Sequence, residues 1–317
     1  MLKINMFNLN KYNFNKAKNI FFILITSVLI IILYTNLKYF FIHRRVELKN
    51  RFITIENIFS NTNNSNKNVT STSIRIENII SNSTYNSTST LVENKISILA
   101  YHQVRNNTKW DSFLIRELLI TPPEIFEKDM KYLSDNGYKS IGLDELIYAI
   151  NNNKVLNSKS VVITFDDGYR DQYINALPIL EKYDMKATFF IYTNAIDKFP
   201  IAMTWDQVID LSNRGMTIGA HTRSHPNLKK IKDENKLVNE ILGSKLLLQE
   251  KIGKPVNFFA YPYGLYSSST VQEVINVGYL GAVADTGGKV HTKKDIYTLK
   301  RFNMGNEYIE MQGVMKW

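Results

Sequence analysis

Hydrophobic positions follow three patterns along this chain, and the first is an uninterrupted apolar run. Residues 20–37 (IFFILITSVLIIILYTNL) carry no charge, and the run continues after Lys38 as far as Ile42. A helix needs about 20 apolar residues to cross the hydrocarbon core of a bilayer. The run also lacks the small-residue cleavage pattern of a secretory signal. We therefore predict an uncleaved transmembrane signal anchor over residues 20–42, preceded by a short basic tail over residues 1–19.

The second pattern is a polar stretch over residues 43–94 that is rich in Asn, Ser and Thr. Segments such as NTNNSNKNVTSTS contain too little apolar surface to form a core, which predicts a flexible linker. Lysines and arginines flank the anchor on both sides, so the charge pattern alone does not orient it in the membrane.

The third pattern begins at residue 95, where short β-branched runs alternate with helical segments. This alternation is typical of βα units around a parallel sheet. The predicted strands are 96–101, 161–165, 187–191, 217–220, 258–261 and 280–284, and helices are predicted over 121–137, 233–251 and 267–277 and from a capping box at Thr204. Six or seven such units in about 220 residues favour a distorted (β/α) barrel over residues 95–317 rather than two domains.

Composition and charge exclude several classes of protein. The 317 residues include no cysteine, so a metal site must use His, Asp or Glu, and a thiol nucleophile is excluded. The net charge of +10 lies almost entirely in the N-terminal arm. Residues 1–95 hold 12 Lys and Arg against 4 acids, whereas residues 96–317 hold 27 against 25. A body with so little excess charge lacks the basic surface of a nucleic-acid-binding protein, so we expect no nucleic acid partner.

Chemically reactive side chains follow two of the predicted strands, at the end where parallel α/β folds carry their active sites. Asp166 and Asp167, with a glycine after them, come directly after strand 161–165; alone, such a pair is more typical of a helix cap and a solvated acid. His221 and His225 follow strand 217–220 at the spacing of one helical turn, which lets both face one ion. A helix cap or a surface pair is the alternative.

A third segment, YPYG at 261–264, ends the aromatic strand 258–261 and alone would be only a turn. Together with TFDDG at 164–168 and HTRSH at 221–225, however, it resembles the motifs of the polysaccharide deacetylase family, in family order. This family is the NodB-homology domain of carbohydrate esterase family 4. The resemblance covers about residues 95–305, and the opening ILAYH at 98–102 is similar to the branch that contains poly-N-acetylglucosamine deacetylases.

The resemblance implies a distorted (β/α) barrel of the NodB type. It also implies a hydrolase of carbon–nitrogen bonds other than peptide bonds, which removes acetyl groups from N-acetylated sugars with a divalent ion, usually zinc. The residues that match the family's ligands are Asp167, His221 and His225, a set that leaves coordination positions open for water and substrate. Asp166 matches the general base, and the backbone N–H of Tyr263 matches the group that stabilises the oxyanion.

Two features depart from the family pattern. Ala260 stands where the third motif has an arginine that orients the base; Arg301 is the candidate replacement, and a surface salt bridge is its alternative role. No Leu-x-His motif closes the chain, so another histidine must protonate the leaving amine. His102, at the end of the first predicted strand, is favoured over His291, which lies in a polar loop over 289–294.

The leading hypothesis is a single-pass membrane protein whose catalytic domain lies outside the cell. Its expected partners are the membrane, through the N-terminal helix, and a polysaccharide of the envelope or matrix that contains N-acetylglucosamine. An O-acetyl esterase is one alternative, because amide and ester cleavage pass through the same oxyanion. A non-catalytic glycan-binding protein is another, which the missing third-motif arginine favours and the intact Asp166, Asp167 and histidine pair argue against.

Overall fold

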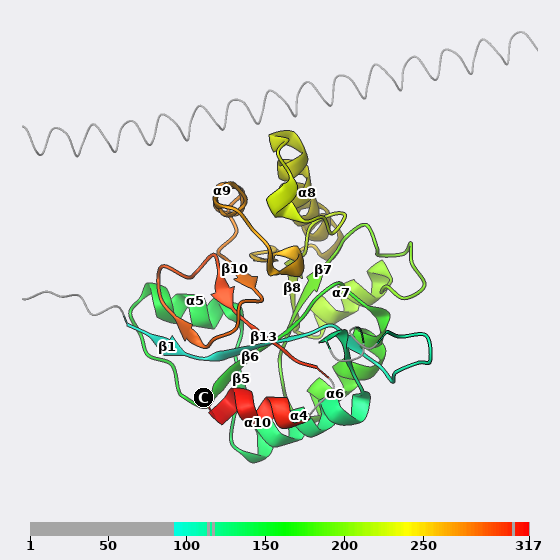
Figure 1. Ribbon diagram of the computed structural model, residues 1–317, viewed down its shortest axis with the longest axis vertical. Helices are drawn as coiled ribbons and strands as arrows, with labels where there is room; N and C mark the ends of the chain where they lie inside the picture. The colour runs from blue at the N-terminus through cyan, green and yellow to red at the C-terminus, as the bar shows by residue number, and fades with distance from the viewer. Residues whose placement is uncertain (1–91, 113–114, 116–117, 306–307, 317) are drawn as a thin grey trace, which may run out of the picture. The chain divides into compact units, whose positions relative to one another are not determined.

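The structure is a computed structural model that describes residues 92–112, 115, 118–305 and 308–316 (Figure 1). The predicted basic tail, the predicted transmembrane anchor and most of the predicted linker lie outside these residues. Among the helices that the structure describes, none combines the length and apolar character needed to span a membrane.

A nine-stranded parallel sheet forms the centre of the domain. Eight strands follow one another in the order β12 (Leu299–Lys300), β10 (Gly281–Ala284), β9 (Phe258–Ala260), β8 (Thr217–Ala220), β7 (Thr188–Ile191), β6 (Ser160–Phe165), β2 (Ser97–Tyr101) and β13 (Phe302–Asn303). The ninth, β5 (Lys139–Ser140), pairs with the beginning of β6. Only Arg301 separates β12 from β13, so the two edges of the sheet meet at one segment and close a distorted barrel.

All six strands predicted from the sequence are present, each within one residue at either end. The strands β12 and β13 are not predicted from the sequence, because two-residue strands are too short to show a periodic pattern. The same holds for β1 (Asn94–Lys95), which pairs with β11 (Val290–His291), and for β3 (Gln103–Val104), which pairs with β4 (Ile120–Thr121).

Helices surround the sheet, as Figure 1 shows. They are α4 (Pro123–Asp135), α5 (Leu143–Asn151), α6 (Leu177–Lys182), α7 (Trp205–Asn213), α8 (Glu234–Ile252), α9 (Ser268–Asn276) and α10 (Tyr308–Lys316). The predicted capping box at Thr204 is present, and Ser267 forms another at the start of α9. The N-cap of α8 is Asp233, and the helix ends at Gly253, whose left-handed φ of +67° suits glycine.

Alternate residues of the strands belong to two buried clusters. Ile163 and Phe165 of β6 pack with residues of the surrounding helices, whereas Val162 packs with residues of β2, β7, β9, β10 and β12 and of α5. Because these strands follow one another around the barrel, we place the second cluster inside it. Successive side chains of a strand point to opposite faces, so Thr164 and Asp166 continue the inward series of Val162. The register of β6 therefore directs a carboxylate to the inside of the barrel mouth.

Candidate active site

Three predicted metal ligands meet at the carboxyl ends of β6 and β8. One carboxylate oxygen of Asp167 and one ring nitrogen each of His221 and His225 all lie within 4.8 Å of one another. Asp167 Oδ1 is 3.5 Å from His221 Nε2 and 3.2 Å from His225 Nε2. Converging oxygen and nitrogen donors on different segments are the arrangement that a divalent ion requires.

The orientation of His221 and the protonation of His225 fit metal binding. His221 Nδ1 lies 2.8 Å from the backbone oxygen of Ala260, and because a carbonyl only accepts, Nδ1 donates this hydrogen bond and Nε2 is the ring nitrogen that faces the other ligands. Burial, followed by the neighbouring His221, lowers the pKa of His225 to about 4, which leaves this imidazole neutral at pH 7. A carboxylate with two imidazoles suits zinc and similar ions.

The two histidines do not lie on a helix, so the interpretation of their spacing as one helical turn is wrong. They flank a tight turn in which Thr222 has φ +68° and His225 has φ +55°, both in the left-handed region. Thr222 Oγ1 accepts a hydrogen bond from the His225 N–H at 3.0 Å. Asp167 also has a positive φ of +72°. Such strained backbone persists only where its surroundings hold it, and it is concentrated at functional sites.

Arg301 and Asp166 form a buried ion pair inside the barrel. Arg301 Nη1 donates to Asp166 Oδ1 at 2.8 Å, and Nη2 donates to Oδ2 at 2.6 Å. Nη1 also donates to Thr164 Oγ1 at 3.1 Å, and Nε donates to Asp285 Oδ1 at 2.9 Å. Arg301 is 0% exposed, so the alternative of a surface salt bridge is wrong. The guanidinium reaches the base candidate from β12 and β13, whereas Ala260 on β9 packs in the inner cluster.

This pair fixes the charge of Asp166. Burial by itself raises the pKa of this carboxyl, but the charge of Arg301, with smaller effects of His221 and His102, outweighs burial and holds the pKa below its ordinary range. Asp166 is therefore ionised at neutral pH and able to accept a proton.

The YPYG turn places Tyr263 next to the metal ligands. Its ring is 62% exposed and lies 4.6 Å, centroid to centroid, from the ring of His225. The following Gly264 has φ +64°, and a Cβ there would lie 2.8 Å from the backbone nitrogen of Asp285. Glycine alone combines a positive φ with the absence of a Cβ. The turn therefore packs closely against Asp285, which also accepts a hydrogen bond from Arg301.

The structure separates the two candidate acids. His102 follows β2 and is partly exposed. It lies close enough to Asp166 and His225 for its charge to lower the pKa values of both, so it is on the same side of the barrel as the ligands. Its buried Nδ1 has no hydrogen-bond partner among the described residues. His291 is 0% exposed, and its Nε2 lies 2.9 Å from the backbone oxygen of Ile96. Burial lowers the pKa of His291 to about 4, so it is a neutral structural residue with no access to substrate.

Three further residues support the site and were not found in the sequence. Tyr169 lies close to Asp167, and burial together with the charge of this carboxylate raises the pKa of its hydroxyl. Gln172 is 0% exposed, and its Nε2 donates to the backbone oxygens of Asp166 at 2.5 Å and of His102 at 2.8 Å. Gln172 begins a π-helical turn, Gln172–Ala176, a feature common at functional sites.

The third residue, Glu240, contacts the turn between His221 and His225. In sequence, polar residues in a helix or beside one resemble a solvated surface, so nothing distinguished these three.

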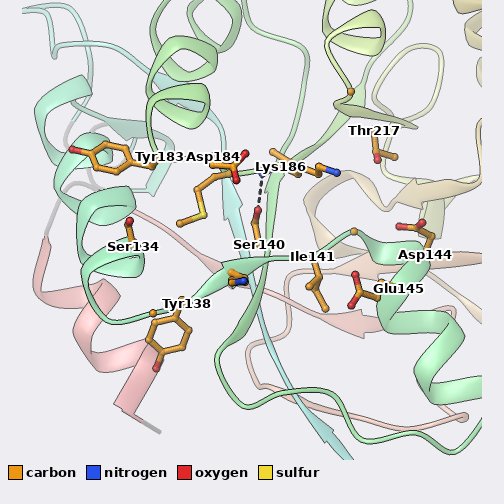
Figure 2. Close-up of a pocket in the computed structure, with 16 residues that line it drawn as sticks. Ser134, Tyr138, Ser140, Ile141, Asp144, Glu145, Tyr183, Asp184, Lys186 and Thr217 are labelled. Carbon is orange, nitrogen blue, oxygen red and sulfur yellow. Dashed lines mark hydrogen bonds between the residues drawn. The ribbon is translucent and has the colours of Figure 1, made fainter.

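A cavity of about 590 Å³, drawn in Figure 2, is lined by none of these residues. Its lining residues, which include Tyr138, Asp184, Lys186 and Thr217, come from segments around β5 and just before β7 and at the start of β8. The Lys186 N–H donates to Ser140 Oγ across it at 2.6 Å. It therefore opens at the amino ends of the strands, whereas the carboxylates and histidines lie at the carboxyl ends, where barrel enzymes carry their chemistry.

Comparisons with known proteins show the family of this chain. Residues 153–282 match the family model for polysaccharide deacetylase. The chain is 31% identical over 204 residues to YxkH of Bacillus subtilis (strain 168), a protein assigned to the polysaccharide deacetylases, covering 64% of this chain and 69% of the relative. It is 26% identical over 232 residues to poly-beta-1,6-N-acetyl-D-glucosamine N-deacetylase of Staphylococcus epidermidis, covering 67% of this chain and 80% of that protein.

A solved structure is similar as well. The Streptococcus pyogenes deacetylase PplD, in complex with acetate, superposes with a TM-score of 0.64 at 27% identity, over 71% of this chain and 99% of that one. The fold and the site define a hydrolase of the NodB-homology class. The chain belongs to the polysaccharide deacetylase family, carbohydrate esterase family 4.

Proposed function

We propose that this protein is a metal-dependent deacetylase that removes N-acetyl groups from a polysaccharide containing N-acetylglucosamine. The observation that carries the proposal is the convergence of Asp167, His221 and His225 next to an ionised Asp166 held by Arg301. The Staphylococcus epidermidis relative is named for the deacetylation of such a polymer, which supports the substrate class.

The residues divide the chemistry among themselves. A divalent ion, for which the ligand set favours zinc, would supply Lewis acidity to the acetyl carbonyl and to a water molecule. Asp166 takes the proton of the attacking water, and Arg301 holds its carboxylate in position. The backbone N–H of Tyr263 donates to the oxyanion as the carbonyl carbon becomes tetrahedral. His102 then protonates the sugar nitrogen, because an amine does not leave as an anion.

The glycan continues into a hollow next to this centre. The hollow has a volume of about 220 Å³ and is lined by Gln103, Arg105, Arg170, Asp171, Ile174, Asn175 and Ile201. Arg170 Nε donates to the backbone oxygen of Ala202 at 3.2 Å, and its two terminal nitrogens have no partner among the described residues. Ile174 and Ile201 are both more than half exposed, which gives an apolar face for a sugar ring beside these donors.

We also propose that the domain works outside the cell and is anchored by residues 20–42. The apolar run and the polar segment 43–94, which provides reach from a membrane surface, support this arrangement. Protease added to intact cells should cut the segment 43–94 and release the domain. Protection of the domain until the cells are lysed would show the opposite topology.

The test of the function is acetate release by the full chain, purified in detergent, from N-acetylglucosamine oligomers. We expect one acetate for each acetyl group that mass spectrometry shows to be lost. Release only from an O-acetylated glycan would support the esterase instead. Binding of the oligomers without release from either substrate would indicate a glycan-binding protein.

A further inference from the structure

Glu240 lies on α8, outside all the motifs, and its carboxylate contacts the turn that joins the two histidines. Oε2 accepts hydrogen bonds from the backbone N–H groups of Arg223 at 3.0 Å and Ser224 at 2.8 Å. Oε1 accepts a hydrogen bond from Ser224 Oγ at 2.5 Å. One side chain therefore satisfies three donors of the segment between His221 and His225.

The environment of Glu240 is unusual for a carboxylate. The side chain is 5% exposed, and among the described residues it forms no salt bridge. A buried charge is costly unless hydrogen bonds replace its hydration, and here the three donors of the turn do so. The carboxylate and the turn therefore stabilise each other. Without the turn the buried carboxylate would lack hydrogen-bond donors, and without Glu240 the three donors of the turn would lack an acceptor.

The turn is held from its other side by the segment after β7. The N–H of Thr193 donates to the backbone oxygen of Thr222 at 3.2 Å, and the N–H of Asn194 donates to that of Arg223 at 2.8 Å. This segment thus satisfies the carbonyls of Thr222 and Arg223, and Glu240 satisfies the amides of Arg223 and Ser224. Since Thr222 and His225 both have positive φ values, the turn needs these external bonds to keep its conformation.

We propose that Glu240 is a positioning residue for the metal site. It holds the 221–225 turn in the conformation that directs His225 Nε2 toward Asp167 Oδ1, 3.2 Å away. Glu240 makes no hydrogen bond to any of the three ligands, so its effect on the ion passes through the backbone of the turn. This inference rests on the proposed function, because it assumes that the three residues bind a divalent ion.

The experiment measures the dissociation constant of Zn²⁺ for the full chain by competition with a chromophoric chelator. Partners that orient ligands typically contribute about 10–100-fold to metal affinity. We expect a weakening in this range for Glu240→Ala, which removes all three acceptors. Glu240→Gln, which keeps an acceptor for the two backbone amides, should lose only a few-fold. Glu250→Ala is the matched control, because Glu250 is an exposed glutamate on the same helix.

A second readout needs no metal. Hydrogen exchange of the Arg223 and Ser224 amides in the apo protein should be faster in Glu240→Ala than in the parent and unchanged in Glu250→Ala. Parental Zn²⁺ affinity in Glu240→Ala would overturn the proposal. If that variant does not fold, Glu240→Met, which keeps the bulk of the side chain and removes the acceptors, takes its place, and parental affinity and parental exchange in it would overturn the proposal. A parent that binds no Zn²⁺ would contradict the proposed function instead, and the exchange rates would still show whether Glu240 holds the turn.

Discussion

Arg301 and Asp166 are 135 residues apart in the sequence, yet they form a fully buried bidentate ion pair where the sheet closes into a barrel. Arg301 lies between β12 and β13, the two strands that join the opposite edges of the sheet. Closure of the barrel and the charge of the base candidate therefore depend on the same residue. A change at Arg301 should affect both stability and catalysis.

We expect Arg301→Met to destabilise the domain by about 3–5 kcal/mol, because it leaves a buried carboxylate without its partner. The double variant Arg301→Met/Asp166→Asn removes that charge and should recover a large part of the loss. Denaturant unfolding of the parent, both single variants and the double variant measures the coupling. Additive single effects would show that the two side chains do not stabilise each other.

The sequence could predict the longer strands, the three residues that meet at their ends and Arg301 as a candidate partner of the base, but not the buried bidentate geometry of this pair. Strands of four or more residues, such as 161–165 and 217–220, show a pattern in the sequence, and the residues just after them are the ones that parallel folds bring together. Arg301 stands in a segment whose strands have two residues each, so only its chemistry made it a candidate. The histidine turn was misinterpreted as helical because spacing alone does not show the positive φ values of Thr222 and His225.

Asp166→Asn should fold, keep its metal and lose most of its activity. A general base contributes about 10²–10⁴-fold to a rate, and asparagine keeps the size of the side chain but cannot accept the proton. Metal content and acetate release are measured on the same preparation. Asp167→Asn is the comparison, because it should lose metal as well as activity. A rate within a few-fold of the parent would mean that Asp166 is a structural partner of Arg301 only.

Asp171→Asn should stabilise the protein above pH 6. Burial raises the pKa of Asp171 to about 6, so the folded state holds its proton more tightly than the unfolded chain does. Stability is therefore lost as the pH rises from about 4 through about 6. The Val104 N–H donates to Asp171 Oδ1 at 2.8 Å, and the amide oxygen of asparagine accepts the same bond.

The measurement is the melting temperature of the parent and of Asp171→Asn between pH 4 and pH 8. The gain should be a few degrees, since about 2–4 °C corresponds to 1 kcal/mol in a domain of this size, and it should shrink toward pH 4. Asp184→Asn, at an exposed position with a φ of +52° that asparagine tolerates, is the control. A gain that does not depend on pH would show that the carboxyl group of Asp171 is not the cause.

Arg170→Ala should weaken the binding of long substrates selectively. If the hollow beside the active site holds a neighbouring sugar, the KM for a tetramer or pentamer should rise several-fold, while kcat and the KM for the shortest cleaved oligomer stay close to the parent values. Lys198→Ala removes the same charge from an exposed residue outside the hollow and controls for general attraction. An equal rise in KM at all chain lengths in Arg170→Ala would contradict the binding of a neighbouring sugar in this hollow.

His102→Ala should impair amide cleavage far more than the cleavage of an activated aryl acetate. The amine of a glucosamine unit must be protonated as the tetrahedral intermediate collapses, whereas an aryl oxide leaves without a proton. We therefore expect a loss of about 10²–10⁴-fold on an acetylated glucosamine oligomer and a much smaller loss on the aryl acetate. His291→Ala is the control, because that imidazole extends from β11 and is buried against the backbone of Ile96, and its loss should alter stability without this selectivity. If His291→Ala alone showed the selective loss, His291 would be the general acid. The segment that buries this residue would then have to open during turnover.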